Sequence, residues 1–291
     1  MFATVLGGLP WPPLADDAPP DEAVRMAIAA QEAAGIEPLT DGGLAWALDD
    51  ALEQDVVASW SRAAALTAQP MKQALPGPYS LAHRTGALAI EVARELRAQV
   101  LALAAAGCPL VEIEETEAHQ IGTDAAERRA YRDAHLALTD GVTGTHLSLA
   151  VVGGNADTAG VETILAPGYA SLAIDLIAGP DNWRLVTAAP QGVGIVLGAM
   201  SSAVDGGEGP EMVLWAARYA ASGGRGSARI GVALVPGLER LPWDVAVRKL
   251  NALGNAARIA ALPPGEELAA SLDPRAIDIR SAALGRHERR R

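Results

Sequence analysis

Carboxylates in one apolar run near residue 110 are the first candidates for chemistry. Glu112, Glu114 and Glu115 close a run that begins at Pro109. Side chains alternate between the two faces of a β-strand, so Glu112 and Glu114 should point together into the interior of a closed sheet. Two buried acids need partners, and such pairs are typical of acid/base sites. The alternative is a structural role, in which each acid pairs with an arginine or with backbone amides.

Further polar residues lie in or at the end of other apolar runs. His146 and Ser148 lie in the run at 144–151, and Asp175 closes the run at 171–175. If the two runs are neighbouring strands, His146 and Asp175 can share a site with Glu114, for acid/base chemistry or for a hard divalent ion. A lone histidine in an apolar strand is more often a core residue whose hydrogen bonds are satisfied than a ligand.

These side chains would be positioned by an alternation of short apolar runs and longer helical segments. The helical segments are predicted at residues 21–34, 86–106, 124–138, 209–221 and 242–261. The strands are predicted at residues 3–6, 37–40, 72–75, 109–114, 144–151, 171–175, 192–197 and 229–235. Eight strands separated by crossovers predict an α/β protein with a single (β/α)8 TIM barrel over residues 1–285, followed by a basic tail at 286–291. An open, doubly wound sheet is the alternative.

Composition narrows the function classes. The chain has 291 residues, 35 acidic and 23 basic side chains, and a net charge of −12, which argues against nucleic acid or an anionic membrane as the partner. A single cysteine, Cys108, cannot form an internal disulfide or supply a pair of thiolates to zinc. The longest apolar run is too short to span a bilayer. We therefore expect a cytoplasmic protein that binds a small molecule.

Four segments, in the same order and with the same spacing, resemble the C-terminal barrel of cobalamin-independent methionine synthases, in a wider group that includes uroporphyrinogen decarboxylase. Residues 4–10 (TVLGGLP) are similar to that family's first strand with Ile-Gly-Ser-Phe-Pro, and residues 23–43 resemble the helix that leads into Thr-Asp-Gly-Glu. Residues 75–80 (LPGPYS) match its Leu-Thr-Gly-Pro segment, and residues 104–115 match its Ala-Ala-Gly strand that ends in Asp-Glu-Pro.

The resemblance implies a zinc site that this sequence does not reproduce. The family holds zinc with a His-x-Cys pair, a glutamate on the next strand and a second cysteine after the last strand. Here the corresponding residues are His146, Ser148 and Asp175, and residues 235–238 contain no cysteine. The family's amino-acid pocket is altered as well, because its serine is replaced by Gly8 and its aspartate by Glu114. Thiolate-bound zinc is therefore not expected, whereas a harder ion at His146 and Asp175 is left open.

Together these observations predict a methionine synthase-like, methyltransferase-like barrel without the thiolate zinc site, which acts on or binds a small molecule at the carboxyl ends of its strands. The predicted catalytic residues are Glu114, His146 and Asp175. The predicted substrate-binding residues are Gly8, Asp41, Glu112, Glu115 and Ser148. Two alternatives stay open: a non-catalytic ligand-binding or partner subunit of a methyltransferase system, and a metal-free lyase or decarboxylase. The cofactor is not predicted, and a homodimer or a methyltransferase partner is left open.

Overall fold

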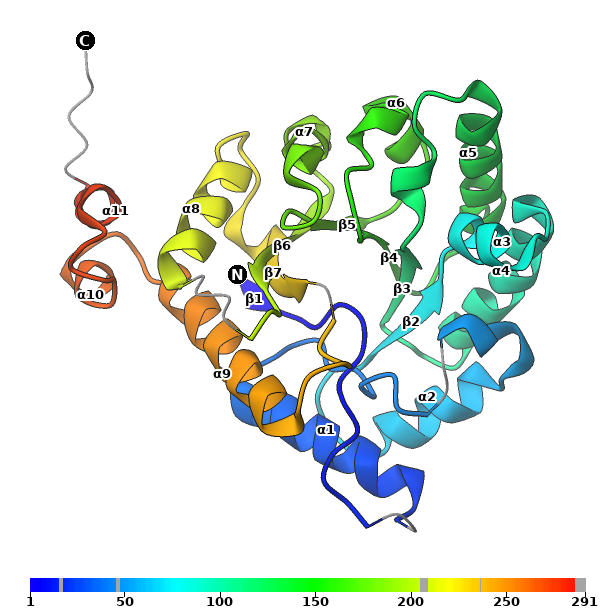
Figure 1. Ribbon diagram of the computed structural model, residues 1–291, viewed down its shortest axis with the longest axis horizontal. Coiled ribbons are helices and arrows are strands. Elements are labelled where there is room, and N and C mark those ends of the chain that lie inside the picture. Colours follow the sequence, from blue (N-terminus) through cyan, green and yellow to red (C-terminus); the bar gives the residue numbers. More distant parts are fainter. Residues whose placement is uncertain (16–17, 46–47, 205–208, 236, 286–291) are drawn as a thin grey trace.

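The computed structural model describes residues 1–15, 18–45, 48–204, 209–235 and 237–285, so the predicted basic tail lies outside the described residues. Its strands are parallel and form one curled sheet in the order β1-β7-β6-β5-β4-β3-β2 (Figure 1). The strands are β1 (Phe2–Ala3), β2 (Lys72–Pro76), β3 (Leu110–Glu115), β4 (His146–Val151), β5 (Ser171–Asp175), β6 (Gly194–Ser201) and β7 (Ile230–Val235). The predicted α/β alternation is confirmed.

The predicted strand at 37–40 is reduced to a single parallel bridge between Leu39 and Met71. The backbone N–H of Glu37 donates to the Ala3 carbonyl at 2.8 Å, and that of Lys72 donates to the Leu39 carbonyl at 2.9 Å. Pro38 has no N–H to add to this ladder, which is why the segment pairs at isolated points and not as a continuous strand. The described sheet therefore has seven strands, and the prediction of a regular eighth strand was wrong at this position.

Helices surround the outer face of the sheet (Figure 1). Pro20 and two acidic residues begin α1, and Gly35 ends it with a φ of 72°, a left-handed conformation that glycine adopts without strain. Asp124 caps α5 by accepting the backbone N–H of Ala126 and Glu127. The helices are α1 (Pro20–Ala34), α2 (Val56–Ala64), α3 (Pro78–Thr85), α4 (Ala89–Ala105), α5 (Ala125–Thr139), α6 (Val161–Ile164), α7 (Trp183–Ala188), α8 (Pro210–Ala221), α9 (Trp243–Ala260), α10 (Glu266–Ala270) and α11 (Ile277–Ala283).

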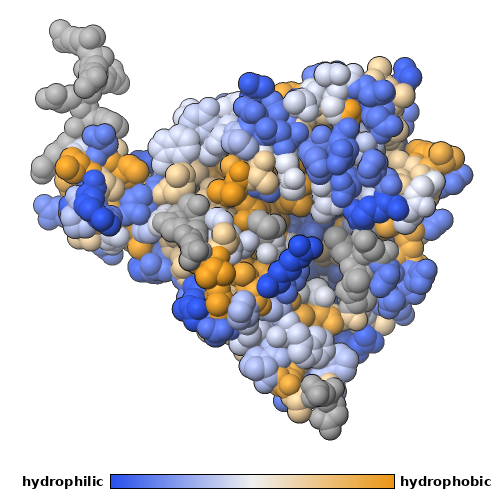
Figure 2. All heavy atoms as spheres, viewed as in Figure 1, coloured by the Kyte–Doolittle hydropathy of each residue, from blue (hydrophilic) through white to orange (hydrophobic). Residues whose placement is uncertain are grey.

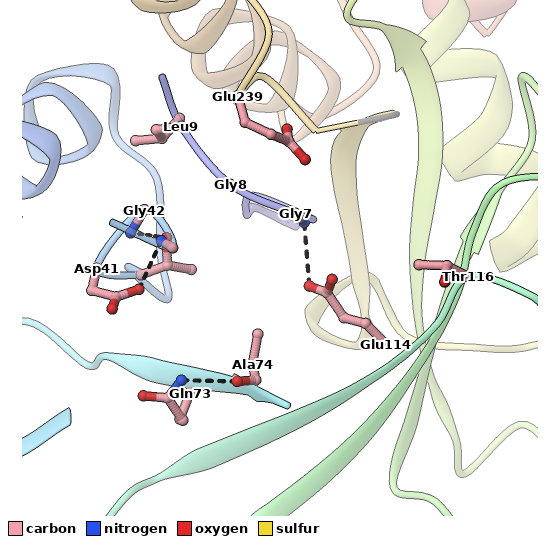
Figure 3. A pocket seen from close by; sticks show the side chains of 12 residues that line it. Gly7, Gly8, Leu9, Asp41, Gly42, Gln73, Ala74, Glu114, Thr116 and Glu239 are labelled. Atoms are coloured by element: carbon pink, nitrogen blue, oxygen red, sulfur yellow. Dashed lines mark hydrogen bonds between the residues drawn. The ribbon is translucent and has the colours of Figure 1, made fainter. Parts of the chain in front are cut away.

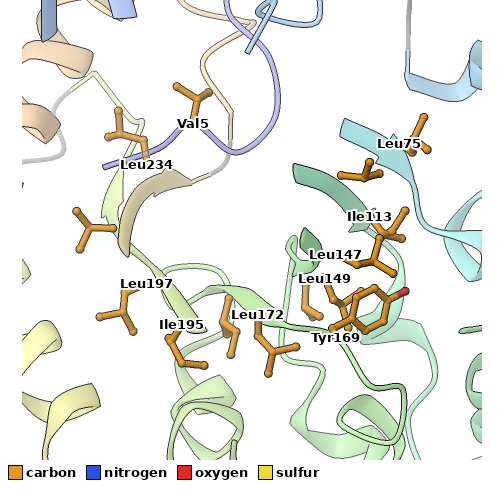
Figure 4. Packing of buried hydrophobic residues seen from close by; sticks show 14 of the residues in the cluster. Val5, Leu75, Ile113, Leu147, Leu149, Tyr169, Leu172, Ile195, Leu197 and Leu234 are labelled. Atoms are coloured by element: carbon orange, nitrogen blue, oxygen red, sulfur yellow. The ribbon is translucent and has the colours of Figure 1, made fainter. Parts of the chain in front are cut away.

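The hydrophobic core has three parts, two of which lie on the two apolar faces of the sheet. Side chains on its outer face, such as Leu75, Ile113 and Leu149, pack under the helices in the main cluster (Figure 4). The inner face carries a smaller cluster, made of Leu6, Ala150, Ala173, Val196, Ala233 and Val235. A third cluster joins α10 and α11 to α8 and α9. None of the described helices is both long and apolar enough to cross a membrane.

Helices α1 and α9 approach closely at Gly254. A Cβ atom at this position would lie 1.7 Å from the Ala34 carbonyl oxygen. Alanine normally favours a helix over glycine by about 1 kcal/mol, but here the added methyl must push two backbones apart. We expect Gly254→Ala to lower the free energy of unfolding by about 1–3 kcal/mol, measured by urea denaturation. The control Ala252→Gly, exposed on α9, should lower it by about 1 kcal/mol. A Gly254→Ala variant more stable than the wild type would contradict this packing.

Candidate functional site

A pocket of about 300 Å³ opens at the carboxyl ends of the strands, between the segment after β1, the turn at 40–43, and the ends of β2 and β3 (Figure 3). Hydrogen bonds join its walls into one unit. The N–H of Leu9 donates to the Gly42 carbonyl at 2.7 Å, and the N–H of Leu238 donates to the Gly8 carbonyl at 2.9 Å. Gly7 and Gly42 have φ values of 70° and 79°, which explains why glycine stands at these turns. Gly8 lines the pocket with its backbone.

Glu114 reaches the pocket from β3, on the inward face that the strand alternation predicted. Its side chain is buried, and its Oε1 accepts the N–H of Gly7 at 3.2 Å (Figure 3). Burial raises the pKa of Glu114 to about 7, with further increases from the charges of Glu112 and Glu239, while Lys72 acts in the opposite direction. Glu114 can therefore exchange a proton near neutral pH.

Two further carboxylates line the same pocket. Asp41 is half-buried, its Oδ1 accepts the N–H of Gly43 at 2.9 Å, and burial raises its pKa. Glu239 was missed by the sequence analysis. It follows β7 and lies against Gly237 and Gly7, where an added Cβ would come within 2.2 Å and 3.3 Å of its carboxylate oxygens. An acidic residue just after the last apolar run was the available signal. Among the described residues, those that line the pocket include no lysine or arginine.

Glu112 lies deeper in the interior, below this pocket. It forms a buried ion pair with Lys72, whose ammonium also donates to the Val5 carbonyl at 2.6 Å. The pair ties β2 and β3 to the segment after β1. Glu112 is thus satisfied by a cation in the interior and does not line the pocket, although the sequence predicted a substrate contact.

Glu115 points to the other face of β3, toward α3. Its carboxylate accepts the N–H groups of Tyr79 and Ser80 at 3.0 and 2.8 Å, the first free amides of that helix. It also pairs with His135 Nε2 at 2.8 Å. A Cβ at Gly77 would overlap this carboxylate, so glycine is required there. The structure places Glu115 as a helix cap and not as a pocket residue.

The structure separates His146 and Ser148 from Glu114 and Asp175. His146 begins β4, level with Leu110, and its Nε2 lies 2.8 Å from Ser171 Oγ. Asp175 ends β5, one position beyond the pairing of Val151 with Ile174. The two therefore differ by six strand positions, or roughly 20 Å at a rise of about 3.3 Å per residue. His146 lies at the amino ends of the strands because it is the first of the six residues of β4.

Asp175 does lie at the carboxyl ends, but its oxygens are occupied by backbone amides. They accept the N–H groups of Gly153, Ile177 and Ala178 at 3.1, 2.9 and 2.9 Å. The carboxylate is fully buried and fixes the loops after β4 and β5. Its contacts support a structural role.

The donor set does not fit a thiolate zinc centre. At the carboxyl end of β4 the inward positions are Ala150 and Val152, which pack on the inner apolar cluster. Cys108 lies before the amino end of β3, and burial raises the pKa of its thiol to about 11. Within the described parts of the chain, no three His, Cys, Asp or Glu side chains come together as a metal site would require.

The cap on α3 can be tested by removing its carboxylate. We expect Glu115→Ala to lower the free energy of unfolding by about 3–5 kcal/mol in urea denaturation, because His135 and two helix amides lose their acceptor inside the protein. Glu115→Gln keeps one acceptor oxygen and should cost less. The matched control Glu95→Gln, on the exposed face of α4, should change stability by less than about 0.5 kcal/mol. Equal effects of Glu115→Ala and the control would rule out the capping role.

No known family model and no curated protein matches the sequence. Solved structures do match. A B12-independent methionine synthase from Shewanella sp. W3-18-1, solved with selenomethionine, gives a TM-score of 0.72 at 17% identity, over 88% of this chain and 96% of that one. A putative vitamin-B12 independent methionine synthase from Listeria monocytogenes gives 0.69 at 14% identity, over 89% and 97%. A methyltransferase from Methanosarcina mazei gives 0.57 at 15%, over 88% and 94%. At these identities the likeness establishes the fold that this chain shares with those proteins.

Proposed function

We propose that this chain is a methyltransferase-like barrel protein without a thiolate zinc site, and that its carboxyl-end pocket holds a small molecule by a protonated amine. One observation carries the proposal: Asp41, Glu114 and Glu239 surround a pocket of about 300 Å³ whose lining contains no basic side chain. The charge of Glu239 raises the pKa of Glu114, so a cation bound between these two carboxylates would be stabilised by both of them. An ammonium group supplies that charge and donates hydrogen bonds to the carboxylates.

The pocket also contains a carboxyl group that can transfer a proton. Because the pKa of Glu114 is about 7, this carboxyl is partly protonated at neutral pH and can take a proton from a bound nucleophile or return it. The N–H of Gly7 fixes one oxygen of Glu114, and the other remains for the ligand. We assign proton transfer in this pocket to Glu114, and electrostatic attraction of the amine to Asp41 and Glu239.

The similar solved structures suggest the class of ligand. The Shewanella protein was solved with selenomethionine, an amino acid whose amine would suit an acidic pocket. We infer an amino acid or related amine as the ligand class here. We also propose that residues 37–40 take the place of an eighth strand, supported by their hydrogen bonds to Ala3 on one side and Lys72 on the other. A cytoplasmic location and a homodimer or methyltransferase partner remain predictions.

Binding of L-methionine, measured by isothermal titration calorimetry, tests the proposal. We expect its affinity to rise about tenfold from pH 6 to pH 8, because Glu114 loses its proton through a pKa of about 7 while the amine stays charged. N-acetyl-L-methionine, which has no cationic amine, should bind at least about tenfold more weakly. Glu114→Gln should abolish the rise with pH, and Asp41→Asn should weaken binding at both pH values.

The control for these variants is Glu95→Gln, which removes one negative charge far from the pocket on an exposed helix face. It should bind L-methionine as the wild type does. Equal binding of the acetylated and free amino acids, or a pH dependence that survives Glu114→Gln, would contradict the amine pocket. A screen for methyl transfer from methylated pterins or corrinoids to thiols then decides whether the bound molecule is also turned over.

A further inference from the structure

A second, larger cavity of about 830 Å³ opens at the opposite end of the sheet, where the strands begin. Its walls come from the first residues of β3, β4, β5 and β6 and from the segments that precede them. His146 and Ser148, which the sequence placed at the other end, line this cavity together with Ser171 and Glu112. It is a distinct space, since none of its lining residues borders the carboxyl-end pocket.

The cavity exists because the inward positions at this end are small. Parallel barrels usually fill their interior with layers of valine, isoleucine and leucine. Here the corresponding positions carry Ser148, Ser171 and Gly194, and Gly231 lies under the ring of Phe2. A Cβ at Gly231 would approach that ring to 2.5 Å, so even alanine is disfavoured there. The chain leaves open a space that its fold normally packs.

The inner end of the cavity is polar, and its charges are already balanced. Lys72 and Glu112 face it as an ion pair, beside the buried hydroxyl groups of Ser148 and Ser171. His146, at the exposed start of β4, has its Nε2 2.8 Å from Ser171 Oγ. Burial lowers the pKa of His146 and Glu112 acts against this, so the imidazole is neutral at physiological pH. Glu37 and Arg229, both exposed, also line the cavity and carry opposite charges, so the lining as a whole has no net charge.

The walls of the cavity are mainly apolar. Leu110 and Val193 line it together with three prolines, Pro38, Pro70 and Pro109. At the mouth, the guanidinium of Arg229 donates to the Gly192 carbonyl at 2.8 Å and is thereby held to the wall. Rigid apolar walls around a few convergent polar groups are characteristic of sites for small organic molecules.

We propose that this amino-end cavity is a second binding site, for an uncharged small molecule with a flat apolar ring and a hydrogen-bonding group. The ring would lie between the proline-rich walls, and the polar group would meet the imidazole of His146 and the hydroxyl groups of Ser148 and Ser171. A charged molecule would find no unpaired counter-charge among Lys72 and Glu112 and would lose its hydration on entry. This site does not depend on an amine in the carboxyl-end pocket.

The probe is indole, a neutral flat ring with one N–H donor. Binding is followed by NMR of protein labelled at the histidine rings, with the His146 signal assigned from His146→Gln. We expect millimolar or lower concentrations of indole to shift the His146 signal and leave that of His83, an exposed residue of α3, in place. Indole-3-propionate and tryptamine, which carry opposite charges, should bind at least about tenfold more weakly.

Filling the cavity provides the decisive variants. Leu110→Trp places a large ring in the cavity and should weaken indole binding at least about tenfold, whereas Leu136→Trp, at an exposed position of α5, should leave it unchanged. Ser171→Leu fills the same space from β5 and is the second variant if Leu110→Trp does not fold.

Three results would overturn the second site: a His146 signal unmoved by millimolar indole, wild-type indole affinity in a folded cavity-filling variant, or displacement of indole by L-methionine. Glu114→Gln should leave indole binding intact. Failure of the amine pocket and failure of this cavity are thus distinguishable.

Discussion

The buried ion pair between Lys72 and Glu112 is the interaction on which the interior of this curled sheet depends. An isolated charge in such a place would cost several kcal/mol, and two opposite charges in contact recover much of that cost. The lysine also donates to the Val5 carbonyl, so one ammonium on β2 joins β3 to the segment that follows β1. The pair lies in the interior between the two cavities, and its charges act on the groups that face each of them.

The face at the carboxyl ends of the strands has two unlike halves. On one side, the ends of β2 and β3 and the turns around them carry the three acids of the pocket. On the other side, β4 and β7 end in apolar residues, among them Ala150 and Val235. The carboxylate of Asp175 there accepts hydrogen bonds from backbone N–H groups of the loops. Around the central hollow of this face, hydrophilic and hydrophobic residues are mixed (Figure 2). The chemistry of the face is therefore concentrated at β1 to β3.

Much of the fold could be predicted from the sequence because apolar runs and their spacing are local signals. Strand alternation correctly placed Glu112 and Glu114 on the inner face. The prediction of a regular strand at 37–40 failed because Pro38 lacks the N–H that a ladder needs. The placement of His146 failed for another reason, since a polar residue in an apolar run does not show whether the strand begins or ends there. The roles of Glu115 and Asp175 depend on backbone amides from distant segments, which no local pattern reveals.

The acidic pocket and its response to pH depend most directly on the state of Glu114, because both follow from a carboxyl buried near other acids. Its pKa can be measured by NMR titration of protein labelled with ¹³C at the glutamate side-chain carboxyl, with the signal assigned from Glu114→Gln. We expect a titration midpoint of about 7. A midpoint near the ordinary glutamate value of about 4.3 would mean that Glu114 is solvated and not buried beside Glu112, and would contradict the acidic pocket.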